Sequence, residues 1–153
     1  MSSPAQSKKT LRVDARALVE SCAGWNSRLA ARRITQFLDE ELAESGLGVA
    51  QLGLMAQIAT AADDTLGALA RSTGLEQSTL SRNLRTLEGL GLIEIAVVES
   101  DLRRRAVWLT EAGARRLEAA LPLWRRAQAK LEKRLSADLA RRLADQAEQL
   151  VEA

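Results

Sequence analysis

The chain has 153 residues, of which 46% are hydrophobic, so it can bury one sizeable core and fold as one domain. Its formal net charge is only +2, which excludes a polybasic arm, so contact with an acidic partner must come from a local basic patch. The chain has no His and a single Cys, which excludes an intramolecular disulfide and a Cys/His metal cluster. We therefore expect no metal and no cofactor.

The sequence contains no stretch that approaches the roughly 18 apolar residues of a membrane-spanning helix. Charged residues between positions 8 and 20 also interrupt any apolar run that could serve as a signal peptide. We therefore expect a cytoplasmic protein that has no membrane partner.

The N-terminal part of the chain is predicted to form one long helix. A loose tail surrounds Pro4, and apolar residues then recur at intervals of three and four through residues 11–42. Gly46 and Gly48 end this pattern. A second helix is expected over residues 49–59. Its inward-facing residues are Leu52, Met55 and Ile58.

The central segment, residues 64–110, has the element order of a winged helix-turn-helix: two short helices, a two-stranded hairpin and the start of another helix. Polar residues at 63–65 can cap the first of these helices, and Gly74 ends it. A tight turn there lets the next helix leave at a steep angle. That second helix is predicted from about Glu76 to about Gly89.

The second helix of this unit has one apolar and one polar face, at about 100° per residue. The apolar stripe, which we expect to face the core, consists of Leu80, Leu84 and Leu87. The opposite side carries the hydroxyl and guanidinium groups of Ser78, Arg82 and Arg85, with Ser81 at its margin. Hydroxyls bond phosphates or base edges, and Arg can bind guanine with two hydrogen bonds in the major groove.

Two wing strands are predicted next, at residues 92–98 and 106–109, where β-branched residues are frequent. The segment between them is expected to be the hairpin tip, and it contains Arg103, Arg104 and Arg105. Three adjacent cations at a narrow tip suit the minor groove or its phosphates. Such a run can also be a solvated turn that keeps the protein soluble. Its position directly after a Ser/Arg helix face favours DNA binding.

The C-terminal part is predicted to form two amphipathic helices. Thr110 stands where an N-cap belongs, with Glu111 in the first turn. Pro122 is expected to kink this helix because it removes one backbone donor. Ser136 is expected to cap the last helix. The terminal helices have more apolar surface than the winged unit can cover, so we expect it to pack against a second subunit.

The chain resembles the MarR family of bacterial transcription regulators in two strings, STLSRNLRTLEGLGLIE and DLRRRAVWLTEAG. The resemblance extends more loosely from about Ser21 to the C-terminal helix. It implies a homodimer that grips a pseudo-palindromic operator in double-stranded DNA and loosens when a small molecule or an oxidant acts on it. The positions that match the family's DNA-reading helix are Ser78, Thr79, Ser81, Arg82 and Arg85. The positions that match its wing are Asp101, Arg103 and Arg105. Leu102 departs from the family pattern, which often has another Arg there, so one phosphate contact fewer is expected.

The effector question centres on Cys22 in the first predicted helix. Some MarR-family relatives sense organic hydroperoxides through a Cys in that helix, with tyrosines holding the thiolate, but this chain has no Tyr. Three alternatives remain open: a thiol sensor at Cys22, a pocket for an aromatic acid, or ordinary packing of apolar side chains. The pocket, between the first, second and fifth helices, would be formed by Cys22, Trp25, Asn26, Leu29, Met55 and Trp108.

Two other classes of function have weaker support. We expect no enzyme and no catalytic residue, because without His a Ser or Cys nucleophile lacks its usual base, and no Gly-rich phosphate loop is present. A winged-helix scaffold that binds proteins but not DNA would have no reason to assemble the Ser/Arg face and the wing arginines.

The sequence therefore predicts a mainly α fold with a small β-hairpin wing (α+β), in which a winged helix-turn-helix is flanked by dimerisation helices. Residues 11–45 and 111–153 are expected to form the helical dimerisation region, and residues 49–110 the DNA-binding lobe. The predicted function is a homodimeric, sequence-specific transcription regulator, a repressor that a small aromatic ligand releases from its operator.

Overall fold

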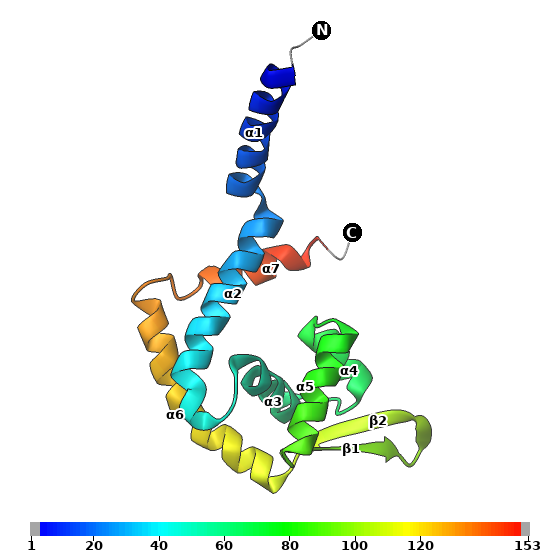
Figure 1. The fold of residues 1–153 in the computed structure, drawn as a ribbon. Helices are drawn as coiled ribbons and strands as arrows, with labels where there is room; N and C mark the ends of the chain where they lie inside the picture. Colours follow the sequence, from blue (N-terminus) through cyan, green and yellow to red (C-terminus); the bar gives the residue numbers. More distant parts are fainter. Residues whose placement is uncertain (1–3, 151–153) are drawn as a thin grey trace. The chain divides into compact units, whose positions relative to one another are not determined.

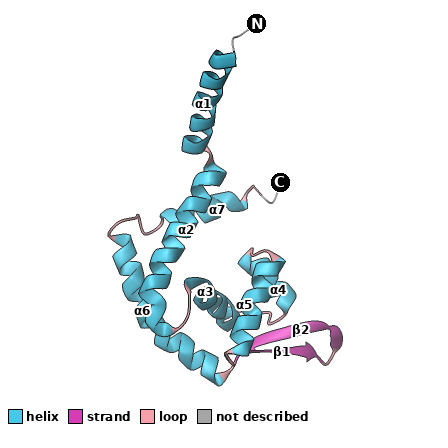
Figure 2. Cartoon of the chain, in the orientation of Figure 1, coloured by secondary structure: helices cyan, strands magenta, loops and turns pink. Residues whose placement is uncertain are grey.

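The computed structural model describes the backbone of residues 4–150 and the side chains of residues 8–150. It is mainly helical with one antiparallel hairpin, as the sequence predicts (Figures 1 and 2). The elements in chain order are α1 (Pro4–Ser21), α2 (Ala23–Leu42), a 3-10 turn η1 (Ala43–Ser45), α3 (Val49–Thr60), α4 (Leu66–Thr73), α5 (Gln77–Gly89), β1 (Ile93–Val98), β2 (Asp101–Leu109), α6 (Glu111–Glu132) and α7 (Leu139–Glu148). The chain divides into two compact units, residues 1–37 and 38–153. Among the described helices, none is both long and apolar enough to cross a membrane.

The first unit contains α1 and most of α2, where the sequence predicted a single long helix. That prediction is wrong, because the helix is interrupted at Cys22. The backbone hydrogen bonds nevertheless continue, since the Cys22 N–H donates to the Leu18 carbonyl (2.8 Å). The side-chain amide of Asn26 donates to three carbonyl oxygens around the interruption, those of Cys22 (2.9 Å), Val19 (3.3 Å) and Glu20 (3.3 Å). Asn side chains compete with the helix for backbone groups in this way, which accounts for the break.

The start of α1 also differs from the prediction of a loose tail around Pro4. The helix begins at Pro4 itself, which suits the first helical position because the missing N–H would have no partner there. Every side chain described in α1 is exposed, including Leu11 (67%) and Leu18 (60%). The part of the predicted apolar stripe that lies in α1 is therefore uncovered in the single chain.

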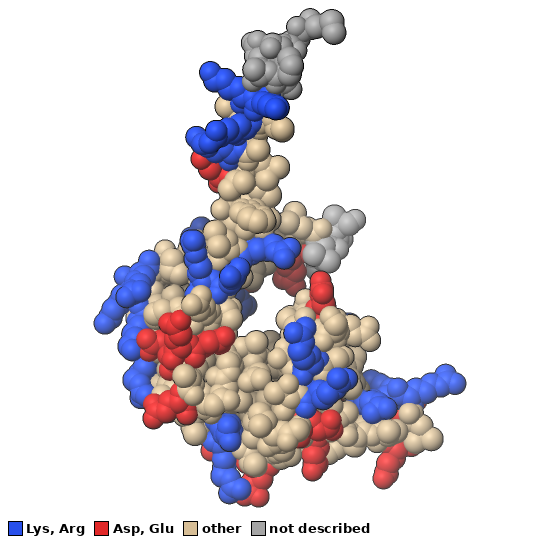
Figure 3. Space-filling view, viewed as in Figure 1, with Lys and Arg blue, Asp and Glu red and all other residues tan. Residues whose placement is uncertain are grey.

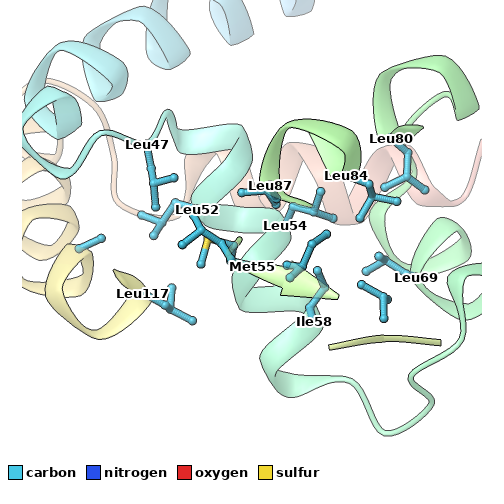
Figure 4. Close-up of a cluster of buried hydrophobic side chains, with 14 of the residues drawn as sticks. Leu47, Leu52, Leu54, Met55, Ile58, Leu69, Leu80, Leu84, Leu87 and Leu117 are labelled. Carbon is cyan, nitrogen blue, oxygen red and sulfur yellow. The ribbon is translucent and has the colours of Figure 1, made fainter. Parts of the chain in front are cut away.

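The core of the second unit lies where α3, α4, α5, α6 and the hairpin meet. The residues predicted to face inward from α3 are buried, and Leu54 joins them. The predicted stripe on α5 is buried as well, with Leu87 fully inaccessible. Figure 4 shows the side chains of α3 facing those of α5 and Leu69 of α4. Burial of this stripe determines which face of α5 remains free.

The first helix of the helix-turn-helix, α4, is fixed at both ends. The Thr65 side chain accepts a hydrogen bond from a first-turn N–H (3.3 Å), and Gly74 ends the helix with a left-handed φ of 61°. The start of α4 is also joined to the wing, because the Val107 N–H donates to the Asp64 carbonyl (2.8 Å) and Thr65 forms a β-bridge with Ala106. These contacts set the distance between α4 and β2.

The wing has a longer second strand than the sequence predicted. Residues expected in the hairpin tip belong to β2, and the turn is reduced to the two residues between Val98 and Asp101. The register shifts at this point, because Val97 pairs with Arg105 whereas Val98 pairs with Asp101. Residues 102–104 therefore form a bulge in β2. A bulge bends the strand and redirects side chains, and the basic residues lie on β2 close to the turn.

The start of α6 lies against the connection between α5 and β1. Thr110 caps α6 as predicted, since its hydroxyl accepts from the Gly113 N–H (3.0 Å). The same hydroxyl donates to the Gly91 carbonyl (2.6 Å), and the Thr110 N–H donates to the Leu92 carbonyl (3.1 Å). A Cβ atom placed on Gly113 would overlap the Leu92 carbonyl oxygen. The backbones of the two segments can approach this closely only because residue 113 is glycine.

Of the two C-terminal helices, α6 agrees with the sequence prediction and the start of α7 differs from it. Pro122 lies inside α6, and Figure 1 shows this helix bending about midway along its length, as predicted. The predicted cap of the last helix at Ser136 is wrong, because Asp138 occupies the N-cap position of α7. The Ser136 carbonyl instead accepts from the Leu139 N–H (3.2 Å) in the turn that precedes the helix.

Replacing Gly113 by Ala is expected to destabilise the protein by about 2–3 kcal/mol, because the obstructing atom belongs to backbone and cannot rotate away. Gly53→Ala in α3 is the matched control, since a Cβ there meets nothing within 4 Å. The control should gain about 0.5–1 kcal/mol from helix propensity. Urea unfolding followed by circular dichroism at one protein concentration measures both changes. Equal unfolding midpoints for the two variants would show that the junction is not tight.

Candidate nucleic-acid interface

The outer face of α5 presents the side chains that the sequence predicted for DNA reading. The exposed members are Ser78, Ser81, Arg82 and Arg85, and Thr79 is half-buried beside them. Neither Arg82 nor Arg85 forms an ion pair with any residue between 8 and 150. Their guanidinium groups are therefore available to an external partner, while the opposite face of the helix is held in the core.

The wing carries its three arginines on β2, and two of them, Arg103 and Arg104, lie within the bulge. Arg103, Arg104 and Arg105 are all exposed. The Asp101 carboxylate accepts a hydrogen bond from the Arg103 N–H (3.1 Å), so in this structure it shapes the wing backbone. Figure 3 shows basic side chains projecting from the wing, at the right of the view, and others on the surface over α5.

A hollow of about 320 Å³ separates the first turn of α4 from β2. It is lined by Thr65, Leu66, Gly67, Arg71, Arg103, Arg104 and Arg105. Sequence reasoning found the wing arginines but missed Arg71. The proximity of Arg71 to the wing depends on the bridge between Thr65 and Ala106, which joins residues far apart in the chain and leaves no local pattern.

One carboxylate, that of Asp63, stands next to this hollow. Its Oδ1 accepts a hydrogen bond from the Thr65 N–H (2.9 Å), and its Oδ2 lies 4.0 Å from Arg104 Nη2. Hydrogen bonds from Thr65, with smaller contributions from the charges of Arg104 and Arg71, hold the pKa of Asp63 below its usual value. Asp63 is therefore ionised at neutral pH and partly offsets the positive charge of the hollow.

Comparison with known proteins identifies the family. The sequence model of the MarR family matches residues 45–104. The transcriptional regulator MosR of M. tuberculosis, solved in complex with DNA, is 32% identical to the chain and superposes with a TM-score of 0.76. That match covers 87% of this chain and 100% of MosR. The chain belongs to the MarR family. Members of this family are DNA-binding transcription regulators with the winged helix-turn-helix fold.

Other solved structures agree with this membership. Apo MarR of E. coli is 25% identical, with a TM-score of 0.63 over 84% of this chain and 96% of that one. MepR of S. aureus, solved with DNA, is 21% identical, with a TM-score of 0.67 over 85% of this chain and 96% of that one, and this likeness concerns the fold. No curated protein matches the chain.

The residues predicted for the effector pocket of this MarR-family protein have different surroundings. In the first unit, Cys22 is half-buried at the helix interruption, whereas Trp25 (57%) and Leu29 (36%) are exposed. Asn26 is engaged with backbone carbonyls around Cys22. In the second unit, Met55 is fully buried in the core, whereas Trp108 donates its indole N–H to Glu94 (3.1 Å) on the neighbouring strand.

An apolar groove of about 250 Å³ lies between α3 and α6. Its lining consists of Val49, Leu52, Gly53, Ala56, Leu117, Leu121 and Trp124. The pocket predicted from the sequence includes Trp25 and Trp108 but not Trp124. The bend of α6 next to Pro122 falls in the same region as Leu121 and Trp124, and bends cannot be positioned from an apolar pattern alone. Within residues 8–150, no group of three or more acidic, Cys or His side chains could hold a metal ion.

Proposed function

We propose that this MarR-family chain is a sequence-specific regulator that binds its operator as a homodimer, represses transcription, and is released by a small aromatic ligand. The observation that carries the proposal is the exposed Ser/Arg face of α5, a helix that packs on the same core as the arginine-bearing strand β2. The DNA complex of MosR, which shares 32% of its residues with this chain, supports the same use of the surface.

The docking that fits this surface places α5 in the major groove and the wing on the adjacent minor groove. In that position Arg82 and Arg85 reach base edges, and the arginines of β2 reach the phosphates that border the minor groove. Two subunits related by a two-fold axis would bind half-sites about one helical turn apart. A dimer that covers a promoter in this way excludes other proteins, and repression is the simplest result.

The dimer proposal rests on apolar side chains that the single chain leaves in solvent. In the first unit these belong to α1 and α2, and the largest is Trp25. In the second unit, α7 has no buried residue, and both Leu139 (50%) and Leu143 (51%) are exposed on it. Monomeric soluble proteins rarely expose large contiguous apolar patches. A second copy is the partner that symmetry provides most simply.

The ligand proposal rests on the groove between α3 and α6. Its lining is almost wholly apolar, and Trp124 provides a flat wall, so an aromatic acid with its charge toward solvent suits it. Because the start of α6 is hydrogen-bonded to Gly91 and Leu92, a ligand that moves α6 would also move the end of the DNA-reading helix.

Oxidation of Cys22 is the alternative trigger for release. If peroxide releases the DNA from wild type, the substitution of Cys22 by Ser shows whether the thiol is the sensor.

Operator DNA obtained by genomic selection tests the reading roles. Arg82→Ala should lose about 1–3 kcal/mol of discrimination between the operator and an unrelated duplex, because it removes a base contact. Arg104→Ala should weaken binding to both duplexes by the same factor. Arg115→Ala, on the exposed side of α6, is the control and should change neither affinity. Fluorescence anisotropy gives the affinities, and operator binding by Arg82→Ala as tight as that of the wild type would refute the assigned role.

Sedimentation velocity at micromolar concentration should show a dimer. Leu143→Glu should shift the population to monomer, because it places a charge in the apolar face of α7. Leu102→Glu is the matched control, since Leu102 is 78% exposed on the wing and should leave the dimer intact. A monomeric wild-type protein would contradict the dimer proposal.

Filling the groove should abolish ligand binding. Ala56→Phe extends a ring into the space between α3 and α6, and we expect it to weaken binding of the aromatic sulfonate ANS by at least about tenfold. Ala62→Phe, at an exposed position outside the groove, serves as the control. ANS fluorescence and operator affinity are measured for each protein. Unchanged ANS affinity in Ala56→Phe would place the ligand site elsewhere.

A further inference from the structure

We propose that the hollow between α4 and β2 binds a single phosphate group of the DNA backbone, which makes Arg71 a DNA-contact residue in addition to the α5 face and the wing. The inference rests on the proposed DNA-binding function and assigns a specific role to the surface that separates the two predicted contact regions.

The composition of the hollow suits a compact oxyanion. Four of its seven lining residues are arginines, one from α4 and three from β2. Guanidinium groups present planar pairs of donors that match the oxygens of a phosphate. Leu66 and Gly67 belong to the first turn of α4, where backbone N–H groups lack partners within the helix. The hollow therefore offers donors from two directions to one anion.

The position of the Arg71 side chain supports the same conclusion. Its Nη1 lies 3.5 Å from the point where a Cβ on Gly67 would be, so the guanidinium lies over the first turn of its own helix. A cation at the N-terminal end of a helix is disfavoured by the helix dipole. Three more guanidinium groups line the same space. An anion placed among them would remove this repulsion, and a side chain at Gly67 would narrow the approach to the backbone.

The charges inside the protein do not balance this cluster. Among residues 8–150, the lining arginines form one ion pair, between Arg104 Nη2 and Asp63 Oδ2 at 4.0 Å. Arg71, Arg103 and Arg105 form no ion pair with other residues in the stretch from 8 to 150. At least two positive charges are thus left for an external partner.

The walls of the hollow are held at a fixed separation. The Val107 N–H donates to the Asp64 carbonyl (2.8 Å), and Thr65 is bridged to Ala106. The site therefore does not need to be assembled when an anion arrives, which lowers the entropic cost of binding. In helix-turn-helix proteins the first helix crosses the DNA backbone while the second reads bases. With α5 in the major groove and the wing on the minor groove, the DNA backbone that separates the two grooves would pass the start of α4.

The test compares wild-type protein with Arg71→Ala and the control Arg115→Ala on the operator and on an unrelated duplex across a range of salt concentrations. Arg71→Ala should weaken binding to both duplexes by the same factor, roughly tenfold. It should also reduce the slope of log affinity against log salt by about 1. Thermal unfolding should be unchanged, since Arg71 is exposed. Equal affinity and equal slope for Arg71→Ala and wild type would overturn the inference.

Operators with one neutral methylphosphonate identify the phosphate directly. A methylphosphonate at one position should weaken the binding of wild-type protein and should not weaken the binding of Arg71→Ala any further. If every substitution weakens both proteins alike, the inference is wrong. If wild-type protein binds no duplex, the proposed function fails together with the inference, whereas wild-type binding with an unaffected Arg71→Ala variant removes the inference alone.

Two further experiments test whether the phosphate comes from DNA and whether Asp63 opposes its binding. Inorganic phosphate at constant ionic strength should displace DNA from wild type better than chloride does, and Arg71→Ala should remove this difference. If Arg71→Ala loses the preference for phosphate but binds DNA as tightly as wild type, the hollow is a site for free phosphate, which would overturn its assignment to the DNA backbone. Asp63→Asn keeps an acceptor for the Thr65 N–H but removes the competing charge. It should tighten binding to both duplexes several-fold, and weaker binding would contradict the assigned site.

Discussion

The contact between the first turn of α6 and the backbone at Gly91 and Leu92 is the constraint on which the DNA-binding unit depends. Thr110 bonds to both carbonyls, and Gly113 lies so close to Leu92 that no side chain fits between them. These two residues follow closely on the end of α5 and lead into β1. The end of α5, the base of the wing and the start of α6 are therefore held together, and a displacement of one must be shared by the others. In the proposed function, a ligand bound in the apolar groove between α3 and α6 would cause such a displacement.

The positive charge of the DNA-binding unit is concentrated in a few arginines on α4, α5 and β2. The chain has a formal net charge of only +2, so a general attraction to DNA is weak and affinity must come from a few arginines in fixed positions. Burial of the leucine stripe fixes the orientation of Arg82 and Arg85, and the bridge between Thr65 and Ala106 fixes the arginines of β2 relative to Arg71. Asp63 is ionised next to this cluster and moderates it. In the proposed docking, base reading and backbone binding thus belong to different elements that share one core.

The parts of the fold that depend on neighbouring residues could be predicted from the sequence. The cap at Thr65, the stop at Gly74, the buried stripe of α5 and the cap at Thr110 each have a short-range chemical cause. The features that were missed depend on contacts between distant residues. The bulge in β2 follows from its pairing with β1, and the nearness of Arg71 to the wing follows from the bridge at Ala106. The break at Cys22 is local, but the apolar period continues across it, so only the hydrogen bonds of Asn26 reveal it.

Methylation interference on the operator tests most directly whether two copies of this unit read DNA together. Methylation of guanine N7 blocks contacts in the major groove, and methylation of adenine N3 blocks those in the minor groove. Two guanine-sensitive patches about ten base pairs apart, each flanked by an adenine-sensitive patch, are the predicted result. A single patch, or sensitivity in the minor groove alone, would contradict a dimer that reads bases through α5.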